Sequence, residues 1–109
     1  MWKAEQTTSV PATSVATTCY SLRPLRNGHA VLSYAADGGA NGRGGLIQLT
    51  WDVSGGRVEW TETTADDIGD TSGLAFSVSY SAGLISVIGT STAAFDVTMS
   101  VVSFEKADK

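Results

Sequence analysis

Residues 46–60 read LIQLTWDVSGGRVEW, and this stretch indicates a β fold. Its apolar side chains alternate with polar ones, the period of two that places them all on one face of a strand. A pair of glycines then interrupts the alternation before it resumes, which is typical of a β-hairpin. The alternating apolar residues are Ile47, Leu49, Trp51, Val53, Val58 and Trp60.

The two glycines predict the register of this hairpin. A two-residue turn at positions 55–56 places Trp51 opposite Trp60 on one face and Asp52 opposite Glu59 on the other. An aromatic pair of this kind stabilises a sheet by up to about 1 kcal/mol. The facing carboxylates are unfavourable, but a neighbouring arginine on the same face can offset them.

Residues 74–89 predict a second hairpin with the same alternation. A turn at Ala82-Gly83 sets the expected pairs, which are Tyr80 with Ile85, Val78 with Val87, and Phe76 with Gly89. The aromatic ring then covers a strand glycine. Alanine is a poor residue for a positive φ, so a three-residue loop with a bulge at Gly83 is the alternative. We expect six side chains of the two hairpins to be largely buried in the core, namely Trp51, Trp60, Phe76, Val78, Ile85 and Val87.

Weaker strands are predicted around residues 2–8, 15–22 and 29–36, and the last strand begins at Phe95. Its alternation slips at Val102, which predicts either a β-bulge or a strand end that passes from one packing surface to another. Seven or eight strands at this spacing predict an antiparallel, jelly-roll-like β-sandwich.

Length and composition restrict the class of protein further. The chain has 109 residues, of which 42% are hydrophobic and 17% charged, and its formal net charge is -4. We expect a single domain spanning residues 1–109, with enough apolar surface for a core. The negative charge argues against nucleic-acid binding. No segment is long and apolar enough to cross a bilayer and no secretory signal is visible, so we expect a protein made in the cytoplasm with no membrane partner.

The residue pattern does not indicate a catalytic site or a cofactor-binding site. Cys19 is the single cysteine, and its alternating surroundings favour a buried small side chain over a reactive thiol. His29 is the single histidine, which argues against a histidine-based metal site, and no nucleophile motif accompanies it. We therefore expect no enzyme activity and no cofactor.

Two segments are expected to be exposed loops that contact a partner. The glycine-rich segment 37–45 lacks the spacing of a phosphate-binding loop, and Asn41 and Arg43 are its candidate contact residues. The polar segment 64–73 contains three aspartates. They could gather around calcium, but the spacing does not match a calcium-binding loop, and a solvated acidic loop is the favoured interpretation. These candidate contact residues are Asp66, Asp67 and Asp70.

Several strands carry adjacent apolar residues, which place apolar side chains on both faces of a strand. A monomeric sandwich is expected to have polar outer faces, so the second apolar face predicts association between copies of the chain. The candidate contact residues are Leu84, Ile88, Val102 and, outside any strong pattern, Trp2.

The order of features along the chain resembles the small β-sandwich domains of tailed-phage virion proteins, found in tail fibres, head fibres and decoration proteins. The features are the segment 6–11, the strands at 19–22 and 29–36, the glycine-rich loop, the two-tryptophan hairpin and the ending at 74–101. The resemblance implies a homotrimer that resides in the virion, binds other virion proteins and in some cases touches a host-surface glycan. Because few residues precede the first strong strand, a decoration or head/tail accessory protein is favoured over a complete fibre. The alternative is a monomeric carbohydrate-binding or adhesin module.

Overall fold

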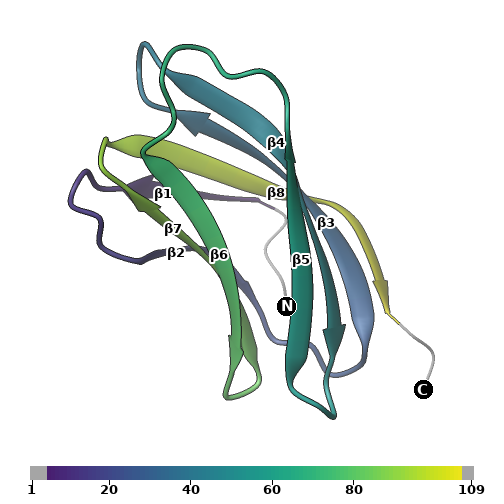
Figure 1. The fold of residues 1–109 in the computed structure, drawn as a ribbon. Coiled ribbons are helices and arrows are strands. Elements are labelled where there is room, and N and C mark those ends of the chain that lie inside the picture. Colours follow the sequence, from purple (N-terminus) through teal and green to yellow (C-terminus); the bar gives the residue numbers. More distant parts are fainter. Residues whose placement is uncertain (1–4, 107–109) are drawn as a thin grey trace.

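The computed structural model of the chain describes residues 5–106, with side chains described through Val102, and the described part contains eight strands and no helix. The strands form two antiparallel sheets that pack face to face (Figure 1). The predicted β-sandwich is thereby confirmed. The strands are β1 (Glu5–Val10), β2 (Thr17–Leu22), β3 (Gly28–Asp37), β4 (Gly42–Asp52), β5 (Arg57–Thr64), β6 (Leu74–Ser81), β7 (Leu84–Ser91) and β8 (Phe95–Lys106).

The larger sheet has the order β1-β8-β3-β4-β5, and the smaller has the order β2-β7-β6. The first strand thus pairs with the last, and the second strand pairs with the seventh, so strands from the two ends of the chain run side by side. In contrast, β3, β4 and β5 follow one another as consecutive hairpins. The connection between β5 and β6 runs over one end of the sandwich (Figure 1).

The predicted register of the β6–β7 hairpin is confirmed at every expected pair, including Phe76 with Gly89. Both turn residues have positive φ, 53° at Ala82 and 79° at Gly83. This is the two-residue type I′ turn, whose twist matches that of the flanking strands. The bulged three-residue loop is therefore not the form adopted.

The predicted register of the β4–β5 hairpin is wrong by two residues. Trp51 lies opposite Val58, and Trp60 lies opposite Leu49, so the two tryptophans share a face without facing each other. A longer turn replaces the two-residue one and places Asp52 opposite Arg57, whose Nη2 donates to Asp52 Oδ2 at 3.0 Å. An attractive charge pair thus replaces the unfavourable pair of carboxylates expected from the sequence.

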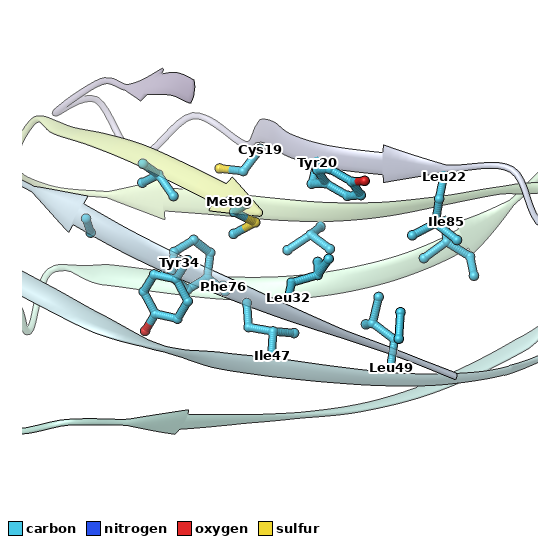
Figure 2. Close-up of a cluster of buried hydrophobic side chains, with 14 of the residues drawn as sticks. Cys19, Tyr20, Leu22, Leu32, Tyr34, Ile47, Leu49, Phe76, Ile85 and Met99 are labelled. Carbon is cyan, nitrogen blue, oxygen red and sulfur yellow. The ribbon is translucent and has the colours of Figure 1, made fainter. Parts of the chain in front are cut away.

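The core lies between the sheets, and Figure 2 shows a cluster of its buried apolar side chains. Within this cluster the rings of Tyr34 and Phe76 meet edge to face, with centroids 4.9 Å apart. Cys19 is fully buried, as expected. Of the predicted core residues, Val78 and Trp60 are only partly buried, because each lies on an edge strand, β6 and β5 respectively, with no further strand beside it.

The predicted bulge in the last strand is confirmed. Leu32 pairs with Val101 and Val31 pairs with Ser103, so Val102 is the extra residue. Its side chain is 61% exposed.

Candidate functional site

The glycine-rich segment is mostly strand, which corrects the expectation of an exposed loop at 37–45. Only residues 38–41 form the turn, with the Gly38 N–H donating to the Asn41 carbonyl at 2.8 Å. A Cβ at Gly45 would overlap the carbonyl oxygen of Thr63, so glycine lets β5 approach β4 closely. Arg43 therefore lies within β4.

The side chain of Arg43 is only 11% exposed and is held by four partners. Its Nη2 donates to the carbonyl oxygens of Thr71 at 2.6 Å and Leu74 at 3.0 Å. Its Nη1 lies 3.5 Å from Glu62 Oε2, and its Nε lies 3.8 Å from Asp67 Oδ1. Arg43 thus fastens the connection between β5 and β6 to the larger sheet, and its placement as an exposed loop residue is wrong.

A buried tyrosine completes this arrangement. The hydroxyl of Tyr34 donates to Glu62, and burial, followed by the nearby carboxylate, raises the pKa of Tyr34. The hydroxyl of Thr71 donates to Asp67 at 2.5 Å. We call these residues the Arg43 cluster: Tyr34, Arg43, Glu62, Asp67 and Thr71. Each buried polar side chain in the cluster has a partner, which is how a structural polar network is stabilised.

The three aspartates expected in the acidic loop do not share a common partner. Asp67 belongs to the Arg43 cluster, and Asp66 is exposed. Asp70 accepts hydrogen bonds from the N–H and hydroxyl of Ser72, which lower its pKa. The backbone N–H of Asp70 in turn donates to Asn41 at 2.9 Å. Among the described residues no group of three potential metal ligands comes together.

The remaining chemically distinctive side chains lie apart from one another. Burial raises the pKa of the Cys19 thiol to about 11, since the thiolate cannot be solvated between the sheets. His29 is the second residue of β3 and is partly buried. Two shallow depressions lie on the β4–β5 hairpin and share Thr50 and Glu59 in their lining.

The smaller sheet differs from the rest of the molecule in charge. Neither β2 nor β6 nor β7 contains an Asp, Glu, Lys, Arg or His, whereas every strand of the larger sheet contains at least one. We call β2, β6 and β7 the neutral sheet. In a chain of net charge -4, the strands of this sheet bring no charged side chain to a contact. A charge lies beside the sheet at Arg23, directly after β2, whose Nη1 donates to the Ala82 carbonyl at the β6–β7 turn at 3.1 Å.

The predicted oligomer contacts fall on different surfaces. Leu84 and Ile88 alternate with buried residues along β7, so both point outward from the neutral sheet. Val102 lies on the larger sheet and cannot join the same patch. Trp2 lies outside the described residues.

Small side chains surround the two apolar ones on the outer face of the neutral sheet. By the pairing of the strands, these neighbours are Thr18, Ser21, Ala75, Ser77, Ser79, Ser81, Ser86 and Thr90. Most side chains on this face are therefore short, none is charged, and another surface can approach it closely. Leu84 and Ile88 are the residues that sequence reasoning found, whereas the neutrality of the whole sheet could be seen only once its strands were known to pair.

No model of a known protein family matches the chain, and no curated protein matches it. The described residues contain no helix capable of spanning a lipid bilayer.

Proposed function

We propose that this protein is a non-enzymatic structural protein that works by assembling with further copies of itself through the outer face of the neutral sheet. The observation that carries this proposal is the absence of charged residues from β2, β6 and β7 in a chain of net charge -4. The centres of protein interfaces are depleted in charged residues. Copies of an acidic chain also repel one another least where neither surface is charged.

Leu84 and Ile88 supply the apolar part of this contact. Both side chains are already partly buried in the single chain, so the contact removes only their remaining exposed surface from water, at about 25 cal/mol per Å² of apolar area. The surrounding hydroxyl side chains are short, so they allow a second sheet face to approach. A closed, symmetric arrangement would bury the patch on every copy, and the resemblance to phage proteins favours a trimer.

The same resemblance suggests where the assembly acts. A small β-sandwich that associates through an uncharged sheet suits a capsid decoration or head/tail accessory protein of a virion. Other virion proteins would then be its partners, bound through surfaces that the self-contact leaves open.

The experiment compares native masses by light scattering or native mass spectrometry. The parent chain is expected to form a homo-oligomer at micromolar concentration, and Leu84→Ser with Ile88→Ser is expected to lower its mass. The matched control is Val31→Ser with Leu46→Ser, which removes two apolar side chains from the outer face of the larger sheet. A parent mass of a single chain, or equal loss in the control, would contradict the proposal.

A second candidate function, the monomeric carbohydrate-binding module, is favoured by the depressions on the β4–β5 hairpin. Their lining combines hydrogen-bonding groups with an aromatic ring, namely Gln48, Thr50, Glu59, Trp60 and Thr61 in one of them. Polar groups beside an aromatic side chain suit a sugar. A glycan array, repeated with Glu59→Gln, tests it: binding that the variant loses supports this function, and an array without signal contradicts it.

A further inference from the structure

Strand β6 is an edge strand without the features that normally protect an edge. Proteins blunt such edges with charged residues, proline or bulges, because unpaired backbone groups recruit other strands. Of the other edge strands, β1 and β5 carry charged side chains and β2 has a bulge between Thr18 and Tyr20. The sequence of β6, LAFSVSYS, has neither charge nor proline, and its pairing with β7 is continuous.

The turn between β6 and β7 decides which backbone groups face outward. In a two-residue hairpin, the residues flanking the turn form a hydrogen-bonded pair, here Ser81 with Leu84. By alternation, the N–H and C=O groups of Leu74, Phe76, Val78 and Tyr80 then point away from β7.

The outward backbone groups of Leu74, the first of these four residues, are already hydrogen-bonded within the chain, as the alternation requires. The N–H of Leu74 donates to the Thr71 carbonyl at 3.0 Å, and its own carbonyl accepts from Arg43 at 3.0 Å. No described residue bonds the outward backbone groups of the other three, Phe76, Val78 and Tyr80. The open part of the edge is thus short and centred on Val78.

We infer that β6 pairs antiparallel with β6 of a second copy, about a twofold axis at Val78. In this register Val78 lies opposite Val78 of the second copy, and Phe76 lies opposite Tyr80. All three open positions are then used, which gives about six backbone hydrogen bonds. A register shifted by two residues in one direction would need the backbone groups of Leu74, which are already hydrogen-bonded. A shift by two residues in the other direction would leave the backbone groups of Phe76 unpaired.

A second copy fits this edge for chemical reasons. Self-pairing of β6 places Ser77 opposite Ser79 of the second copy, with no like charges facing each other, and forms two aromatic pairs on the inner side. A twofold contact is also self-complementary and closes. This inference rests on the proposed function in one respect, that copies of the chain associate. The contact between the two β6 edges is separate from the contact made by Leu84 and Ile88 on the outer face of the neutral sheet.

Disulfide cross-linking tests the register directly. Ser77→Cys and Ser79→Cys are made as separate proteins, and both side chains are exposed. In the proposed register, Ser77 of one copy faces Ser79 of the other at a non-hydrogen-bonded position, where Cα atoms are about 4.5 Å apart and a disulfide can form. In either variant alone, the two cysteines are diagonal neighbours about 7–8 Å apart. A mixture of the two variants should therefore cross-link about tenfold more than either alone. Equal yields, or none, would overturn the inference, and the parent chain with buried Cys19 is the blank.

A proline at the centre of the edge separates this contact from the face contact. Val78→Pro removes an outward N–H that β7 does not use, so the hairpin should persist while edge pairing is blocked. Val78→Thr is the control, and circular dichroism checks the fold of both. Introduced into the two cysteine variants, Val78→Pro should abolish cross-linking, whereas Leu84→Ser with Ile88→Ser should leave it intact.

The two proposals can fail separately. Loss of native mass with Val78→Pro but not with Leu84→Ser and Ile88→Ser would contradict the face contact and support the edge contact. Cross-linking that survives Val78→Pro would overturn the edge contact alone. A parent chain that is monomeric at micromolar concentration would overturn both.

Discussion

Arg43 donates a hydrogen bond to the backbone carbonyl of Leu74, 3.0 Å away, and thereby joins the larger sheet to the first residue of β6. The bond satisfies a group that would otherwise extend the open edge of the smaller sheet. One side chain thus stabilises the connection between the sheets and limits where a further strand can pair.

Replacing Arg43 by Met should destabilise the protein by about 2–4 kcal/mol, because it leaves two backbone carbonyls without their donor and Glu62 without its cationic partner. Urea denaturation measures the change. The control is Arg57→Met, which breaks an ion pair whose arginine is 76% exposed and which should cost less than about 1 kcal/mol. Equal effects would show that the Arg43 cluster is not structurally important.

Phe76→Ala should cost about 3–5 kcal/mol, since it empties an aromatic site in the core and uncovers Gly89. The ring carbon Cε1 lies 3.4 Å from where a Cβ on Gly89 would be. The comparison is Ser77→Ala on the exposed face of the same strand, which should change the free energy of unfolding by about 0.5 kcal/mol or less. A Phe76→Ala protein as stable as the parent would mean that the faces of β6 are reversed.

Ala82→Asn should stabilise the protein by about 1 kcal/mol, because asparagine tolerates the positive φ that alanine adopts there at a cost. Thermal unfolding followed by circular dichroism gives the shift. Ser81→Asn, one residue earlier in the strand, should bring no gain. A lower melting temperature for Ala82→Asn would argue against the type I′ turn.

The free energy of unfolding should fall as pH rises from about 9 to 11, in part through Cys19. Its pKa is about 11 in the folded chain against 9.0 for the model thiol, so over this window the unfolded chain releases a proton that the folded chain retains. The Cys19 contribution is fully present below pH 9 and lost above the folded pKa.

Across that window, the free energy of unfolding of Cys19→Ala should fall by about 1–2 kcal/mol less than that of the parent. Denaturation curves at pH 8 and pH 11 measure the difference, and Tyr34, whose pKa is also raised, contributes equally to both proteins. Identical pH dependence in the two proteins would show that the thiol does not ionise differently on unfolding.

The pairs of the β6–β7 hairpin could be predicted from strict alternation and the glycine at position 83, and the φ angles of Ala82 and Gly83 then excluded the bulged three-residue loop. The pairs of the β4–β5 hairpin could not be predicted in this way. A shift of two residues keeps every side chain on its face, so the alternation fits both registers equally well. The choice depends on Asp52 meeting Arg57 and on Asn27, from a distant segment, accepting a hydrogen bond from the Val53 N–H.

By itself, the sequence determined the β class, the faces of the strands and most of the core, since these depend on local alternation. It also determined that Leu84 and Ile88 point away from that core. Only the tertiary structure decided that Arg43 is held inside the sandwich, because its partners lie 19 to 31 positions away in the chain. The uncharged surface of the neutral sheet was likewise decided by the tertiary structure. Its strands are separated in sequence, and their lack of charge becomes a surface property only when hydrogen bonding between β2, β7 and β6 brings them side by side.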